Sequence, residues 1–254
     1  MPDLPVLNAL NAGRPPTPGE PPSLPEVRED PAFIAAGEAK DTFVRAAQMA
    51  RMDHSLTDLY RAVGVVKAYN TCVQRLGELR VDLDARRARR MTWITSTGLP
   101  LGPGIPTDAS PADRVVLLSA FTAAFERQAG AEKRARVLAD AQRFGDESTL
   151  RATLTAALDE SDWRTFDRWA SEHSPTSGAL AREWRKLNRL IGGYTGEVEA
   201  LFEQQMFTLI RPPEEVRTLP SLVQAANNQA EAFNRHRGPG VPLRPMITVD
   251  QLLA

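Results

Sequence analysis

The sequence predicts an all-α protein: a long central helix or helix hairpin, with a bundle of shorter helices packed on it. Two observations predict this class. No proline lies between Pro31 and Pro100 or between Pro111 and Pro175, and proline inside a helix removes a backbone donor and usually breaks it. Within these gaps, apolar residues recur at steps of three, four or seven, which places them on one helix face. An extended proline-rich N-terminal arm and an irregular C-terminal arm complete the prediction.

The longest predicted helix runs from Ser55 to Met91, which corresponds to about 55 Å. Ser55 is the expected N-cap, and the arginines at 86–90 suit the negative end of the helix dipole. The expected apolar stripe consists of Leu56, Leu59, Val63, Val66, Val73, Leu76, Leu79 and Leu83. Such a helix is longer than a compact domain needs, so we expect a strut on which other helices pack or which pairs with a copy of itself.

Asn70 lies seven residues after Val63 and therefore falls on this stripe. A polar residue at such a position often sets the register or the oligomeric state of a helix pair, so Asn70 is a candidate register residue. The alternative is that the stripe drifts around the helix and leaves Asn70 half-solvated at its edge, because 3.6 residues per turn do not match a seven-residue repeat.

The N-terminal segment holds nine of the twenty prolines within residues 1–31. Proline fixes φ and lacks an N–H, so this stretch is expected to be an extended, partly polyproline-II arm. A disordered tail is the alternative. Four leucines favour an arm that anchors on a neighbouring subunit; they are Leu4, Leu7, Leu10 and Leu24.

Five consecutive segments are expected along the chain. They are the arm (1–31), the strut region (32–97), a Gly/Pro loop (98–110), the helical bundle (111–237) and the C-terminal arm (238–254). The strut region should begin with a helix over Pro31–Met52 and end with a short extended piece over Thr92–Thr95. The inward residues expected of that first helix are Phe33, Ile34, Phe43, Val44 and Met49.

The bundle is expected to consist of successive short helices. Ser110 is the clearest N-cap, with Pro111 at the first helical position. The expected helices are Ser110–Ala129, Ala131–Phe144, Glu147–Leu158, Ser161–His173 with Ser161 as its cap, Ser177–Ile191, Thr195–Ile210 and Ser221–His236. Thr248 and Gln251 form a possible capping box for a last helical turn.

Composition narrows the classes of function. The formal net charge is −1, so no overall charge draws the chain to nucleic acid or to an anionic membrane. Cys72 is the only cysteine, which excludes an internal disulfide and a thiolate-cluster metal site. No run approaches the roughly 20 apolar residues of a membrane-spanning helix, and the N-terminus does not resemble a signal peptide. We therefore expect no membrane association and a cytoplasmic location, or one within an assembly built in the cytoplasm.

The sequence carries none of the common catalytic or phosphate-binding motifs. Gly192–Gly196 is glycine-rich but has no preceding strand and no lysine, so it indicates a helix stop. The histidines, His54, His173 and His236, are far apart and lack the spacing of paired metal ligands. We expect no enzyme activity, no catalytic residue, no metal and no cofactor.

Two clusters are candidate contact sites. The first is Arg86, Arg87, Arg89 and Arg90 with Trp93, where guanidinium groups neutralise phosphates and a ring stacks on a base. Its alternative is a helix end with solvated arginines, some of them paired with Asp82 and Asp84. The second is a candidate partner surface on a helix pair, made of Trp163, Trp169, Trp184, Arg185 and Arg189. Its alternative is a helix hairpin whose aromatic residues are core.

Together these features predict a non-catalytic helical structural or adaptor subunit. It would act through self-assembly and contacts with other proteins, by analogy with virion or scaffold components. The alternative is a nucleic-acid-binding protein that uses the arginine cluster and the tryptophan helix pair.

Overall fold

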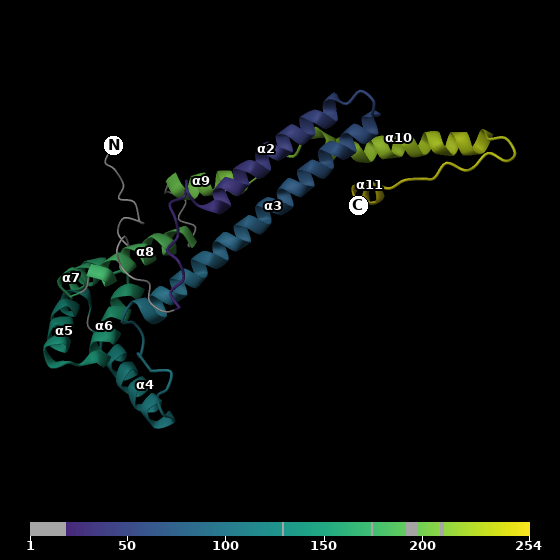
Figure 1. Cartoon of the computed structure of the whole chain (residues 1–254). Helices are drawn as coiled ribbons and strands as arrows, with labels where there is room; N and C mark the ends of the chain where they lie inside the picture. The colour runs from purple at the N-terminus through teal and green to yellow at the C-terminus, as the bar shows by residue number, and fades with distance from the viewer. Residues whose placement is uncertain (1–18, 129, 174, 192–197, 209–210) are drawn as a thin grey trace, which may run out of the picture. The chain divides into compact units, whose positions relative to one another are not determined.

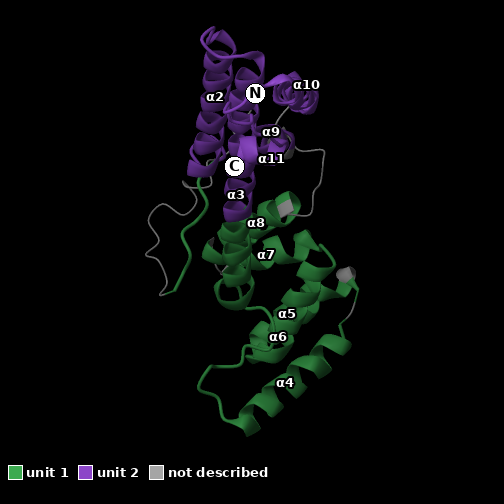
Figure 2. Ribbon diagram, turned by 90° about the vertical axis from the view of Figure 1, so that its right-hand side faces the viewer, with its two compact units in different colours: residues 1–26, 84–194 green, residues 27–83, 195–254 purple. Residues whose placement is uncertain are grey.

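The computed structural model describes residues 19–128, 130–173, 175–191, 198–208 and 211–254. Within these ranges it confirms the all-α prediction: there are ten α-helices, one short π-helix and no strand (Figure 1). The chain forms two compact units, residues 1–26 with 84–194 (unit 1) and residues 27–83 with 195–254 (unit 2) (Figure 2). This grouping differs from the five consecutive segments expected, because the chain returns to its first helix after residue 194.

The strut helix is confirmed as α3, Asp58–Trp93, an unbroken helix of 36 residues. It begins three residues later than predicted, and the assignment of Ser55 as its cap is wrong. The Ser55 N–H and hydroxyl both donate to Asp53 Oδ1, at 2.9 and 2.5 Å. The predicted extended piece at Thr92–Thr95 is also wrong. The helix continues into a π-helix, η1 (Ile94–Gly98), and the Thr95 hydroxyl donates to the carbonyls of Met91 and Thr92, which favours helical backbone.

Unit 2 is built on α2 (Pro31–Met52), which packs on the first part of α3 and on α9 (Val198–Phe207). Asp30 caps α2 by accepting from the Ala32 N–H at 2.8 Å. The buried residues of α2 are Ala32, Phe33, Ala36 and Ala47, so small alanines form most of the contact. The inward assignment of Ile34, Val44 and Met49 is wrong, since these three side chains are 51%, 58% and 73% exposed.

The apolar stripe of α3 is only partly as predicted. Val63 and Val66 pack toward α10, and Leu76, Leu79 and Leu83 pack toward α2 and α9. Leu56 and Val73 are exposed instead. Cys72 rather than Val73 faces α2, because α2 and α10 approach α3 from different sides and the buried stripe shifts between them.

The C-terminal arm is held to α10 (Glu214–His236) by two asparagines that the sequence analysis did not single out. Asn227 and Asn234 each use the side-chain amide twice. The Asn227 amide bonds the N–H and the carbonyl of Ile247, and the Asn234 amide bonds the N–H and the carbonyl of Arg244. All four distances are 2.8–2.9 Å. The last turn is α11 (Val249–Leu253), and its capping box of Thr248 and Gln251 is confirmed. α10 begins at Glu214 rather than Ser221 and contains Pro220.

Unit 1 contains the end of α3 and η1, followed by five helices. They are α4 (Pro111–Glu126), α5 (Ala131–Phe144), α6 (Glu147–Asp159), α7 (Trp163–His173) and α8 (Pro175–Ile191). Its core includes Ile94 of η1, Leu154 of α6, Phe166 of α7 and Leu180 of α8, each at most 1% exposed. Ser161 does not cap α7. It takes φ 58°, and Asp162 accepts from the Thr165 N–H and hydroxyl.

Two glycines give opposite expectations for the change to alanine. A Cβ on Gly98 would lie 2.9 Å from the Trp93 ring and 3.0 Å from Leu180, whereas a Cβ on Gly77 of α3 meets nothing within 4 Å. We expect Gly98→Ala to lower the free energy of unfolding by about 1–3 kcal/mol through overpacking. Gly77→Ala should raise it by up to about 1 kcal/mol through helix propensity. Urea unfolding followed by circular dichroism measures both, and equal effects of the same sign would contradict the close packing at Gly98.

The N-cap of α6 predicts a pH dependence. Asp146 accepts from the Thr149 N–H at 3.0 Å and from its hydroxyl at 2.7 Å, and these bonds lower the pKa of Asp146. Because the pKa is lower in the folded state, this stabilisation is complete above the ordinary aspartate range and is lost as the pH falls through the folded pKa. Asp146→Ala should cost about 1 kcal/mol at neutral pH. The difference from the unchanged chain should shrink in acid, as measured by urea unfolding at several pH values.

Candidate functional site

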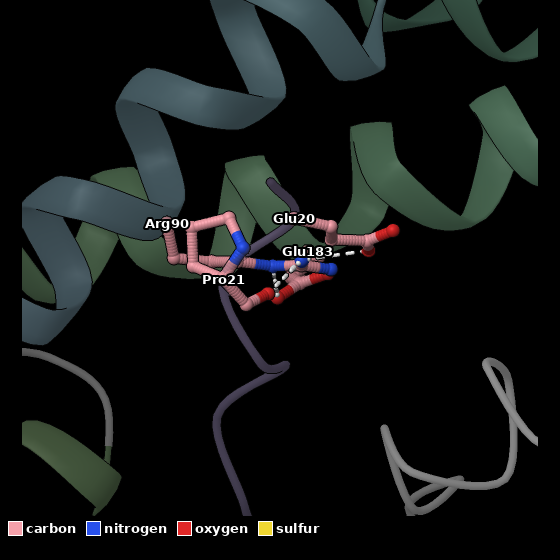
Figure 3. Close-up of polar contacts among 4 residues, drawn as sticks. All are labelled: Glu20, Pro21, Arg90 and Glu183. Carbon is pink, nitrogen blue, oxygen red and sulfur yellow. Dashed lines mark hydrogen bonds and ion pairs between the residues drawn. The ribbon is translucent and has the colours of Figure 1, made fainter. Parts of the chain in front are cut away.

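A buried arginine fastens the proline-rich segment to unit 1. The Arg90 side chain is 1% exposed. Its Nε and Nη2 donate to Glu183 Oε1 and Oε2 of α8, at 2.8 and 2.9 Å. Its Nη1 donates to Glu20 Oε1 at 2.8 Å and to the Pro21 carbonyl at 2.7 Å. Figure 3 shows the guanidinium between α8 and the extended segment. We call these four residues the arm anchor.

The electrostatics of the arm anchor keep the guanidinium charged. Burial acts to lower the pKa of Arg90, but the hydrogen bonds that Arg90 donates to Glu183 and Glu20 outweigh this effect, so the pKa is raised. A planar guanidinium matches a carboxylate in a bidentate pair, and the attraction within the pair offsets part of the free-energy cost of desolvating both ions. The Arg90 guanidinium also lies 4.9 Å from the centre of the Trp93 ring.

The residues after the arm anchor are held as well. Leu24 packs against the apolar core of unit 1, and Lys186 Nζ of α8 lies 3.7 Å from Glu26 Oε2. Residues 20–26 of the predicted arm are therefore extended chain bound to unit 1. Residues 1–18, with Leu4, Leu7 and Leu10, lie outside the described residues.

The geometry does not support the arginine cluster as a single phosphate-binding surface. Arg87 and Arg90 are 3% and 1% exposed, and Arg90 is bonded to two carboxylates. Trp93 is 8% exposed and belongs to the core of unit 1, so its ring offers no open face for a base. The nucleic-acid assignment of these three residues is therefore corrected. Arg89 is exposed and Arg86 is half-buried.

The tryptophan helix pair is mainly core, as its alternative interpretation held. Trp169 is 7% exposed and meets Phe166 edge-on, with ring centres 5.8 Å apart, so its place in a partner surface is corrected. Trp163 and Trp184 are half-buried with ring centres 5.6 Å apart, and Arg185 lies 4.8 Å from the centre of the Trp163 ring. Arg189 is exposed. A partner surface at this edge stays a prediction.

Asn70 is exposed on α3. It is off the buried stripe of unit 2, so the edge interpretation holds within one chain. A role in setting the register against a second copy stays a prediction.

A groove of about 390 Å³ lies between α2 and α3 in unit 2. Its lining includes Ala39, Phe43 and Cys72. Burial raises the pKa of the Cys72 thiol, against the smaller opposing effect of Lys40, so the thiol stays protonated at neutral pH and is not an activated nucleophile. Across the described parts of the chain, no group of three or more His, Cys, Asp or Glu side chains is arranged to hold a metal ion.

An apolar surface on α4 was not predicted from the sequence. The predicted helix is confirmed, and Ser110 accepts from the Asp113 N–H as its N-cap. Most of the apolar side chains of α4 nevertheless point to solvent. We call this surface the α4 outer face; it consists of Val115, Val116, Leu118, Ala120, Ala123 and Phe125. The signal that was available is a stretch from Val115 to Phe125 without a single charged residue.

Comparisons with protein-family models, with curated proteins and with solved structures found no match to this chain. None of the described helices has the length and apolar character needed to cross a membrane.

The arm anchor predicts a large loss of stability when one partner is removed. Glu183→Ala should lower the free energy of unfolding by about 3–5 kcal/mol, because it leaves the buried Arg90 charge without its bidentate partner. The matched control is Glu172→Ala in α7, which breaks an exposed pair with Arg168 and should change stability by less than about 1 kcal/mol. Urea unfolding compares the two, and similar losses would contradict the anchor.

Proposed function

We propose that this chain is a non-catalytic structural or adaptor subunit that works by self-assembly and contacts with other proteins. The α4 outer face carries this proposal. Val115 and Val116 are 65% and 66% exposed, and Leu118 is 50% exposed. Single exposed apolar residues are normal on a protein surface, but a contiguous apolar patch usually marks a contact with another molecule.

The arm anchor supports the same function. In the arm anchor, a buried charge network binds an extended segment, and Leu24 of that segment packs against the core of unit 1. The fixed segment 20–26 joins the nineteen preceding residues to unit 1. We assign to Leu4, Leu7 and Leu10 contacts with a neighbouring subunit, and we place the assembly in the cytoplasm or in a structure built there.

The nucleic-acid alternative has weaker support. Arg90, Arg87 and Trp93 are buried, which leaves Arg86 and Arg89 as the arginines of the cluster nearest to solvent. Two side chains without a broad basic surface release few counterions and bind weakly at physiological salt. Unchanged binding of a DNA or RNA probe after Arg86→Ala and Arg89→Ala would remove the cluster from consideration.

Light scattering on the intact chain over a range of concentrations tests the proposed function. We expect a mass above the 27.9 kDa of one chain that rises with concentration. Deleting residues 1–18 keeps the arm anchor and should reduce the association if the arm contributes to it. A mass of one chain at every concentration would contradict self-assembly.

A further inference from the structure

The α4 outer face is not filled by the rest of unit 1. α4 packs on α6, and Ala124 is its buried residue, with Leu117 and Phe121 half-buried beside it. Figure 2 shows α4 beside α6 at the margin of unit 1. The other positions from Val115 to Phe125 are exposed. More than half of the circumference of the helix is therefore open to solvent, and the side chains on this exposed part are apolar or small.

The charges at the two ends of α4 indicate what covers the side of the helix that carries Val116, Ala120 and Ala123. Val115, Leu118 and Phe125 lie on the opposite side of the helix and stay exposed in this pairing. Asp113 and Arg114 precede the uncharged stretch, and Glu126 and Arg127 follow it. In an antiparallel pair of two α4 helices centred on Ala120, Asp113 lies opposite Arg127 of the second copy. Arg114 and Glu126 lie about 120° around the helix from Ala120, so they take no part in this pair. A parallel pair with the same centre brings Asp113 against Asp113 and Arg127 against Arg127, so the order of charges favours only the antiparallel arrangement.

The side chains along one stripe fit this pairing. Asp113, Val116, Ala120, Ala123 and Arg127 follow one another at steps of three and four, and all five are exposed, so they share one helix face. Alanine at the centre lets two helices approach closely, while Val116 fills the space beside it. The existing bonds of the end residues stay local. Asp113 accepts from the Ser110 hydroxyl, and Arg127 Nε donates to the Ala123 carbonyl, so neither bond involves an opposite charge.

We propose that α4 pairs antiparallel with α4 of a second copy of this chain, about a two-fold axis that passes Ala120. This inference rests on the proposed function and names its partner surface. α4 is about 24 Å long, and one helix pair of this length buries less than the roughly 800 Å² per partner of a stable complex. The expected dimer is therefore weak, with a Kd in the micromolar range.

Ala120→Glu is the first test, because it places two carboxylates against each other at the axis. We expect the Kd from light scattering or sedimentation equilibrium to rise at least tenfold. The matched control is Ala232→Glu on an exposed position of α10, which should leave the Kd unchanged. Circular dichroism of both variants checks that the helices remain folded.

A cross-link tests the axis without disturbing the fold. In a Cys72→Ala background, Ala120→Cys brings two thiols together, so a short bis-maleimide should yield a covalent dimer. Ala232→Cys should not. A charge exchange tests the ends: Asp113→Lys and Arg127→Glu should each weaken the dimer, and the double variant should restore it.

The outcomes separate this inference from the proposed function. An oligomer that survives Ala120→Glu, gives no cross-link at residue 120 and shows no rescue overturns the α4 pairing and leaves self-assembly through another surface. A monomer at every concentration overturns both the pairing and self-assembly, and it assigns the α4 outer face to a different protein.

Discussion

The architecture of unit 1 depends on the burial of one charge. A guanidinium taken out of water is costly unless its donors are satisfied, and Arg90 meets this condition only when three parts of the chain come together. Glu183 brings α8 to the end of α3, and Glu20 with the Pro21 carbonyl brings the proline-rich segment to the same place. The apolar core around Ile94 and Leu180 then packs beside this network. A second buried arginine, Arg134 of α5, pairs with Glu160 and Asp162 before α7, although its Nε has no hydrogen-bond partner.

Polar side chains also decide how the irregular segments of this chain are held. In unit 1 the partner of the extended segment is a guanidinium. In unit 2 the partners of the returning arm are the amides of Asn227 and Asn234, which replace the missing backbone pairing of an extended strand. Both devices bond backbone groups directly. The described part of each arm is therefore held through its backbone as well as by apolar contacts, those of Leu24 in unit 1 and of Ile247, Val249, Leu252 and Leu253 in unit 2.

The distribution of apolar surface supports the proposed role of the chain as a subunit. The described cavities contain no activated nucleophile: the Cys72 thiol is protonated, with its pKa raised mainly by burial. Apolar groups that one chain would normally bury remain outside on α4, in a helix whose ends carry complementary charges. Surface chemistry of this kind favours association with a similar helix, because burial supplies the free energy and the end charges select the direction.

The sequence by itself determined the elements. Local signals act within a few residues, so proline gaps, caps and apolar spacing were enough to place α2, α4, α5 and the capping box of α11, and to predict the long α3. Only the tertiary structure decided which faces are buried. Arg90 was expected either to contact nucleic acid or to belong to a solvated helix end, and the exposure of the apolar side chains of α4 was not predicted. Burial depends on partners that are distant in sequence, such as Glu20 and Glu183 for Arg90. Periodicity identifies an apolar face, but it does not show whether another part of the same chain arrives to cover it.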